Sequence, residues 1–215
     1  MNTVLGGISA ALQSGRAKTV KELVEQALSE GVPPKEILEQ GLLAGMDAVA
    51  VKFKNDEIYI PEVLIAARAM TAGMEPLKPD LAQSGAKPIG KALLGTVKGD
   101  LHDIGKNLVR MMLEGKGVEV VDLGVDVPPE RFVAAYKEHN ADIVALSALL
   151  TTTMGEMENT VKAFAAEGLR DKVTIMVGGA PVTDRFREKI GADLYAADAA
   201  SAAEAAKQAI LARRP

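Results

Sequence analysis

The spacing of apolar residues changes about one third of the way along this chain of 215 residues. Up to residue 74 they recur every three or four positions, the period of amphipathic helices. One such stripe runs through Val20, Leu23, Val24, Ala27 and Leu28. Two more stripes follow the prolines at 33–34 and at 61, and proline favours the first turn of a helix. Residues 1–74 are therefore expected to form a small antiparallel helical bundle.

The next segment, 75–88, lacks this period. Together with the two residues before it, it reads GMEPLKPDLAQSGAKP and contains three prolines and two glycines. Proline and glycine interrupt both helices and strands. We therefore expect residues 75–88 to be a linker between two domains, and a natural hinge.

From residue 89 onward, short apolar runs alternate with helical patterns. The runs cover 91–97, 118–124, 141–147, 172–179 and 192–196, and the last helical pattern contains Ser201 and Glu204 at capping-box spacing. Continuously apolar strands are typical of a parallel sheet covered by helices on both faces. Residues 89–215 are expected to form an α/β domain with a five-stranded parallel sheet in flavodoxin-like (Rossmann-like) winding. In such sheets, ligands bind beyond the carboxyl ends of the strands.

Composition excludes several classes of function. The chain has no cysteine, which removes disulfides, iron–sulfur clusters, thiolate zinc sites and thiol nucleophiles, and fits a cytoplasmic protein. A net charge of −4 with mixed signs makes nucleic acid an unexpected partner. No apolar run is long enough for a membrane span, and the N-terminus lacks the pattern of a signal peptide.

The turn after the first predicted strand reads KGDLHDIGKN and contains His102, one of only two histidines. Asp100 is close enough to hold one ring nitrogen, as carboxylates do for metal-binding histidines. The glycines on either side would let a large ligand approach. The alternative is a histidine that merely lines or caps a turn.

A metal site built by the protein alone would need about three or four ligands. The second histidine, His139, ends a predicted helix, where it suits the helix dipole. The turn matches neither a Walker loop nor GxGxxG. A single histidine is sufficient if the metal arrives in a macrocycle that supplies four equatorial nitrogens.

The stretch GDLHDIGKNLV, with the pattern D-x-H-x-x-G, resembles the signature of cobalamin-dependent methyltransferases. The resemblance continues through VVDLGVDVPPE, LSALLTTTM and VGGAPV. These segments are similar to the corrinoid-binding module of methionine synthase. Nearly the whole chain, including its helical half, more closely resembles the stand-alone corrinoid proteins of methanol, methylamine, glycine-betaine and methoxyaromatic methyltransferase systems.

The resemblance implies roles for individual residues. His102 would displace the cofactor's own base and bind cobalt from below (base-off, histidine-on), and Asp100 would hold its other nitrogen. Thr153, where the methionine synthase pattern has serine, would complete a proton relay, although a helix N-cap is an equally good reading of this threonine. The cofactor's nucleotide tail would lie in a slot. Its expected lining and the further expected cofactor contacts are Asp103, Gly105, Ser147, Leu149, Thr151, Gly178, Gly179, Ala180, Tyr195 and Asp198.

By the same resemblance, residues 1–74 would be a cap over the upper cofactor face, with Phe53 and Ile60 shielding the cobalt-bound methyl group. Ordinary bundle core is the alternative for this apolar pair. Two further positions have structural alternatives: Asp198 is also a natural N-cap for the last helix, and Gly178–Gly179 suits a tight turn between a strand and a helix.

The implied function is a methyl shuttle rather than a complete enzyme. Cobalamin or a related corrinoid would cycle between cob(I)alamin and methylcob(III)alamin. The expected partners are a substrate:corrinoid methyltransferase, a second methyltransferase acting on tetrahydrofolate or a thiol, and a reductive activator. Methanol, methylamines, betaines and aryl methyl ethers all remain open as donors.

Three other classes stay open on the sequence. A corrinoid-dependent sensor would share the binding module but would need an output domain. A small subunit of an adenosylcobalamin mutase would share D-x-H-x-x-G, and the apolar pair Phe53 and Ile60 argues against it. A receiver-type signalling domain would leave His102 unexplained.

Overall fold

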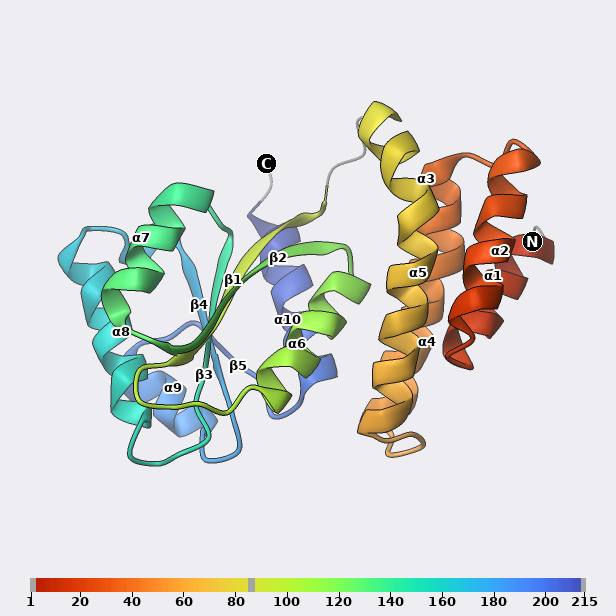
Figure 1. The fold of residues 1–215 in the computed structure, drawn as a ribbon. Helices are drawn as coiled ribbons and strands as arrows, with labels where there is room; N and C mark the ends of the chain where they lie inside the picture. Colours follow the sequence, from red (N-terminus) through yellow and green to blue (C-terminus); the bar gives the residue numbers. More distant parts are fainter. Residues whose placement is uncertain (1–2, 85–87, 214–215) are drawn as a thin grey trace. The chain divides into compact units, whose positions relative to one another are not determined.

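In the computed structural model, which describes residues 3–84 and 88–213, the chain divides into two compact units (Figure 1). Unit 1 comprises residues 1–88 with the short turn 115–117, and unit 2 comprises residues 89–114 and 118–215. The division along the chain therefore falls between Pro88 and Ile89. Residues 85–87 of the expected linker lie outside the described residues.

Unit 1 is helical, as predicted. Its helices are α1 (Thr3–Gln13), α2 (Ala17–Ser29), α3 (Pro34–Glu36), the π-helical η1 (Ile37–Leu43), α4 (Ala44–Lys54) and α5 (Ile60–Ser84). The segments α3, η1 and α4 follow one another without a break. The apolar stripes meet in the interior, where Leu5, Ile8, Leu12, Val20, Val24, Ile37 and Leu42 are fully buried or nearly so.

The expected linker is wrong for residues 75–84, because α5 continues to Ser84 with Pro76 and Pro79 inside it. Proline lacks an amide hydrogen and usually interrupts a helix. Here tertiary contacts support the helix: Leu77 is completely buried, and Glu75 accepts a hydrogen bond from Lys21 of α2 at 2.9 Å. Two prolines in a short stretch were therefore a misleading breaker signal.

Unit 2 is the predicted α/β domain. In chain order its elements are β1 (Gly90–Val97), α6 (Ile104–Gly115), β2 (Val118–Val127), α7 (Pro129–His139), β3 (Ile143–Ser147), α8 (Met154–Ala166), η2 (Arg170–Lys172), β4 (Thr174–Gly178), α9 (Asp184–Ile190), β5 (Leu194–Tyr195) and α10 (Ala199–Ala212). The five strands are parallel in the order β2-β1-β3-β4-β5, which confirms the flavodoxin-like fold. Helices α7, α8 and α9 cover one face, and α6 and α10 cover the other (Figure 1).

The alternation of strand side chains separates the two faces of the sheet. Leu93 and Val97 of β1 enter the core beneath α7 and α8, where Tyr136 and Phe164 meet edge to face with ring centroids 5.5 Å apart. Thr96 points to the opposite face, although it is fully buried. This polar residue in an apolar strand bears directly on the site described below.

The last residues of the central strands lie in register. Thr96 of β1 pairs with Ser147 of β3, and Ser147 pairs in turn with Gly178 of β4. Because all three strands run in the same direction, the loops that follow them emerge at one edge of the sheet. The predicted capping box at this edge is wrong, because α10 begins at Ala199 and Asp198 is its N-cap.

Candidate functional site

The loop between β1 and α6 contains the Asp100–His102 pair. The amide of Asp100 donates to the carbonyl of Val97 at 3.1 Å, which closes a turn at the end of the strand. The Asp100 side chain is completely buried, whereas half of the His102 side chain is exposed. The loop thus carries a carboxylate anchored inside the fold and an imidazole open to a ligand.

The Asp100 carboxylate receives hydrogen bonds from two loops. Its Oδ1 accepts from the His102 ring Nδ1 at 2.7 Å and from the His102 amide at 3.1 Å. Its Oδ2 accepts from the amides of Leu149 and Leu150 at 2.8 and 3.2 Å and from the Thr153 hydroxyl at 2.8 Å. Burial alone would raise the pKa of Asp100, but these hydrogen bonds outweigh it and hold the pKa well below its usual range.

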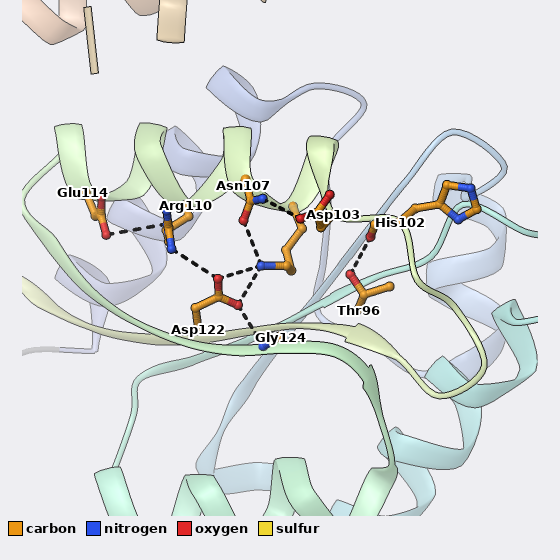
Figure 2. A network of polar contacts seen from close by, with 9 residues as sticks. Thr96, His102, Asp103, Asn107, Arg110, Glu114, Asp122 and Gly124 are labelled. Atoms are coloured by element: carbon orange, nitrogen blue, oxygen red, sulfur yellow. Dashed lines mark hydrogen bonds and ion pairs between the residues drawn. The ribbon is translucent and has the colours of Figure 1, made fainter. Parts of the chain in front are cut away.

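This arrangement fixes the tautomer of His102. An ionised carboxylate has no proton to donate, so Nδ1 of His102 must carry the hydrogen that joins it to Asp100. In a neutral imidazole the lone pair is then on Nε2, which makes no hydrogen bond to any described residue. Figure 2 shows the ring pointing away from the polar side chains of α6. The pair therefore presents a single oriented nitrogen ligand.

Thr153 precedes α8 and occupies its N-cap position, but its side chain does not cap the helix. The hydroxyl lies 2.8 Å from Asp100 Oδ2 and 2.9 Å from the carbonyl of Leu150. Both neighbours are acceptors, so its single proton is shared between them. Of the two sequence interpretations, the hydrogen bond to Asp100 describes the side chain and the cap does not.

Sequence reasoning missed Thr96, which fixes the backbone of His102. Its hydroxyl donates to the His102 carbonyl at 2.8 Å (Figure 2). The available signal was a hydroxyl residue in the otherwise apolar run KALLGTV. The histidine is thus held at its ring, its amide and its carbonyl.

Sequence reasoning also missed an ion-pair network between α6 and β2 (Figure 2). Lys106, with only 2% of its side chain exposed, donates to both oxygens of Asp122 at 2.7 Å. Arg110 reaches Asp122 at 3.3 Å, and the Gly124 amide reaches it at 2.9 Å. Burial raises the pKa of Asp122, but the hydrogen bonds and charges of these partners lower it by a larger amount. The pKa of Asp122 is therefore below its ordinary value. The network attaches α6, which follows His102 directly, to the sheet.

The start of α6 holds two residues that the sequence assigned to the cofactor. Asp103 accepts a hydrogen bond from the Asn107 side chain at 3.0 Å, and Asn107 in turn accepts from Lys106 at 3.0 Å. Asp103 is therefore tied into the α6 network. At Gly105, an added Cβ would meet no atom within 4 Å. Packing within the chain gives no reason for glycine here, which fits the approach of a group from outside.

The loops after β3 and β4 meet closely. Gly179 has a φ of +132°, and a Cβ there would lie 1.9 Å from the carbonyl oxygen of Ala148. A side chain at 179 would therefore displace the backbone of the neighbouring loop, and only glycine allows this approach. Ser147, which is half-buried, pairs with Gly178 at the carboxyl ends of β3 and β4. Thr151 and Ala180 follow in the loops after β3 and β4 and are exposed.

Tyr195 and Asp198 lie at the end of β5. Tyr195 pairs with Val177 of β4 and is partly buried. Asp198 caps α10: its carboxylate accepts from the amide and the hydroxyl of Ser201, both at 2.8 Å. The structure therefore shows a helix cap at Asp198, and a contact of either residue with a cofactor stays a prediction.

Phe53 and Ile60 belong to unit 1. Phe53 is in the last turn of α4 and is half-buried, and Ile60 begins α5 with 40% exposure. The short connection between the two helices places both residues at the same end of the helical unit. Their predicted role as shields of a methyl group stays a prediction.

Four large apolar residues lie next to the Asp100–His102 pair in the chain or donate their amides to Asp100, and they are open to solvent; we call them the apolar rim. Leu101 and Ile104 are 71% and 73% exposed, and Leu149 and Leu150 are 43% and 41% exposed. Such a cluster on a protein surface usually marks a binding site. Among the described residues, no group of three or more His, Cys, Asp or Glu side chains could hold a metal ion. A metal bound here would have to bring its own equatorial ligands.

The fold and this edge define a ligand-binding α/β domain with one oriented histidine in an apolar rim. Residues 90–207 match the family described as B12 binding domain, and residues 4–78 match a second family of the same description. The chain therefore belongs to the B12-binding family. Among the described helices, none is long and apolar enough to cross a membrane.

Curated relatives cover almost the whole chain. It is 44% identical over 208 residues to dimethylamine corrinoid protein 3 of Methanosarcina acetivorans, and the match covers 97% of each chain. It is 46% identical over 207 residues to the dimethylamine corrinoid protein of Methanosarcina barkeri, with 95% and 96% covered.

Solved structures agree in fold. The methanol:cobalamin methyltransferase complex MtaBC of Methanosarcina barkeri matches with a TM-score of 0.87 and 31% identity, covering 98% of this chain and 80% of the other. A cobalamin-binding protein of Desulfitobacterium hafniense DCB-2 matches with a TM-score of 0.80 and 34% identity, covering 95% and 98%.

The residues of unit 2 fit a corrinoid on structural grounds. A corrin is a wide, largely apolar ring that already supplies four nitrogens to its metal. His102 offers one further nitrogen, the exposed leucines and Ile104 offer apolar contact, and Gly105 leaves room for a close approach. The site therefore offers one further nitrogen ligand and apolar contacts, and the four other nitrogens come from the corrin itself.

Proposed function

We propose that this chain is the corrinoid-carrying methyl shuttle of a multi-component methyltransferase system. The observation that carries the proposal is the pairing of His102 Nδ1 with the buried carboxylate of Asp100 at 2.7 Å, which leaves Nε2 as an oriented ligand. The names of the relatives support it, since they are corrinoid proteins, and one structural match is a complex of a methyltransferase.

In this proposal the cofactor binds base-off and histidine-on. Nε2 of His102 would hold the cobalt, and Ser147, Thr151 and the segment 178–180 would hold the displaced nucleotide tail. The apolar rim around His102 contacts the ring. The tail and the ring thus use the loops that emerge at the same sheet edge.

Asp100 and Thr153 tune this ligand. The carboxylate holds the proton on Nδ1 and keeps the ring in one orientation, which increases the donor strength of Nε2. The Thr153 hydroxyl and the Leu149 and Leu150 amides stabilise the charge of the carboxylate. Because its charge is stabilised in this way, the carboxylate keeps the proton of the pair on Nδ1, and Nε2 stays available to a metal.

When bound, the corrinoid supplies a cobalt that accepts a methyl group as Co(I) and releases it from the methylated Co(III) state. The chain needs partners for both transfers. We propose a substrate:corrinoid methyltransferase, a second methyltransferase acting on tetrahydrofolate or a thiol, and a reductive activator, all in the cytoplasm. Phe53 and Ile60 are proposed to shield the methyl group from water between transfers. The carrier itself would then have no turnover alone.

A corrinoid-dependent sensor is the second candidate, because it would use the same binding module. It would retain the cofactor but would not hand on a methyl group. The exposed apolar rim and the oriented histidine serve both functions equally, so the distinction lies in transfer and not in binding.

The test loads the protein with cobalamin, reduces it, and methylates it with isotopically labelled methyl iodide. We expect about one label per chain after gel filtration. The label should then pass to a thiol or to tetrahydrofolate when the matching methyltransferase is added. Label that is retained with both acceptors would contradict the shuttle and favour the sensor.

A further inference from the structure

The strand β2 departs from regular pairing where it passes the His102 loop. Leu94 of β1 pairs with Asp122, but Gly95 pairs with Gly124, and Val97 pairs with Val127. β2 therefore contains one extra residue at each of these two steps. Such bulges redirect side chains and are frequent beside functional sites.

The second irregularity contains Asp126, which has a φ of +54°. This conformation is unfavourable for most residues other than glycine, asparagine and aspartate. The described non-glycine residues with positive φ are Asp56, Asp126 and Asn140. Asn140 is explained as the left-handed C-cap of α7, but Asp126 ends no helix.

Asp126 instead makes two hydrogen bonds to the turn before His102. Its carboxylate Oδ1 accepts from the Gly99 amide at 2.6 Å, and its own amide donates to the Asp100 carbonyl at 3.0 Å. The two bonds hold the Gly99–Asp100 segment at its two ends, one at the Gly99 amide and the other at the Asp100 carbonyl. The unusual backbone of Asp126 is what brings both of its groups to this two-residue segment.

Asp126 and Thr96 hold the loop from its two sides. Thr96 fixes the His102 carbonyl from β1, whereas Asp126 fixes the backbone of Asp100 from β2. The buried Asp100 side chain then joins its own backbone position to the imidazole. The orientation of the ring therefore depends on where Asp126 holds the peptide at 99–100.

We propose that Asp126 is a positioning residue that sets the orientation of His102 through the Gly99–Asp100 peptide. The proposal rests on the proposed axial role of His102. It predicts that an acceptor oxygen on the side chain of residue 126 is required, and that tolerance of positive φ is not the only reason for aspartate at this position.

Two substitutions separate these reasons. Asp126→Gly keeps the backbone conformation and removes the acceptor, whereas Asp126→Asn keeps both the conformation and an oxygen that can accept from Gly99. The control is Asn140→Gly, which makes the same backbone change at the end of α7, before β3 begins and away from the carboxyl edge of the sheet. All variants are made in the full chain, and their thermal midpoints show whether they fold.

The first measurement is amide hydrogen exchange at Gly99 and His102 in the apoprotein. We expect exchange at Gly99 to be about tenfold faster in Asp126→Gly, since the hydrogen bond from the Gly99 amide to the side chain of residue 126 is lost. Asp126→Asn and Asn140→Gly should stay near the wild type. Equal exchange in Asp126→Gly and wild type would overturn the proposal.

The second measurement is the electron paramagnetic resonance spectrum of Co(II)cobalamin added to each variant. Asp126→Gly should show a smaller fraction of histidine-bound cobalt, with Asp126→Asn restoring it. An undiminished histidine-bound fraction in Asp126→Gly would overturn the positioning role. Absence of histidine coupling in the wild type would instead overturn the proposed function, while the exchange data would still decide whether Asp126 holds the loop.

Discussion

The Asp100 carboxylate and the His102 imidazole are joined at 2.7 Å although only one residue separates them in the chain. The same carboxylate oxygen also accepts a hydrogen bond from the His102 amide at 3.1 Å. One buried anion thus fixes both the backbone and the ring of the exposed histidine. Its other oxygen is satisfied from the loop after β3, so the site is assembled across two neighbouring strands.

Asp100→Asn should weaken this assembly. A carboxamide has one oxygen acceptor where the carboxylate has two, so at least one buried donor among the Leu149 amide, the Thr153 hydroxyl and the His102 ring loses its partner. We expect a loss of about 1–3 kcal/mol in the free energy of unfolding. Urea denaturation of the apoprotein measures it. An unchanged midpoint and slope would show that these hydrogen bonds contribute nothing net.

Thr153→Val should remove the hydroxyl while keeping the shape of the side chain. Thr153 is nearly buried, so we expect a cost of about 1 kcal/mol from the lost hydrogen bond to Asp100. Thr153→Ser is the matched control, because it keeps the hydroxyl and should restore most of the stability. If Val and Ser behave alike, the hydroxyl is not what the position requires.

The ion pair between α6 and β2 predicts an asymmetry. Asp122→Asn leaves the ammonium of Lys106 buried without a charged partner, and breaking a buried pair in this way costs about 3–5 kcal/mol. Lys106→Met should cost less, because Asp122 keeps Arg110 and the Gly124 amide. Urea denaturation at neutral pH tests the order, and the reverse order would contradict the account.

The same pair predicts a pH dependence. Because the pKa of Asp122 is lowered in the folded protein, its stabilising effect is complete above the ordinary carboxyl pKa of 3.8 and is lost as the pH falls through the lower folded value. The difference in stability between wild type and Asp122→Asn should therefore shrink below about pH 4. A difference that stays constant down to pH 2 would show that the charge of Asp122 is not responsible.

The contact at Gly179 can be tested with a matched glycine. Gly179→Ala would place a Cβ against the Ala148 carbonyl at an unfavourable φ, and we expect it to cost more than 2 kcal/mol, as severe overpacking does. In Gly155→Ala the Cβ meets nothing within 4 Å, at an exposed position of α8, so stability should rise by up to about 1 kcal/mol. Thermal unfolding of both variants decides, and a tolerated alanine at 179 would refute the close approach.

The order of strands and helices was predictable because short apolar runs alternate with helical patterns along unit 2, and the three central strands β1, β3 and β4 are almost wholly buried. The linker was not, because Pro76 and Pro79 are local breakers and the burial of Leu77 is a tertiary effect that no local pattern reveals. His102 and Asp100 stood out by residue type in a short turn. Thr96 and Asp126 did not, because their partners depend on strand register and on a bulge.

The central claim is that His102 supplies the lower nitrogen of the bound cobalt. We would label the protein uniformly with ¹⁵N, add unlabelled Co(II)cobalamin, and record the electron paramagnetic resonance spectrum. A nitrogen from the protein would split the cobalt lines into doublets, and His102→Ala should lose them. Triplets from the cofactor's own ¹⁴N base, or doublets that persist in His102→Ala, would contradict the account.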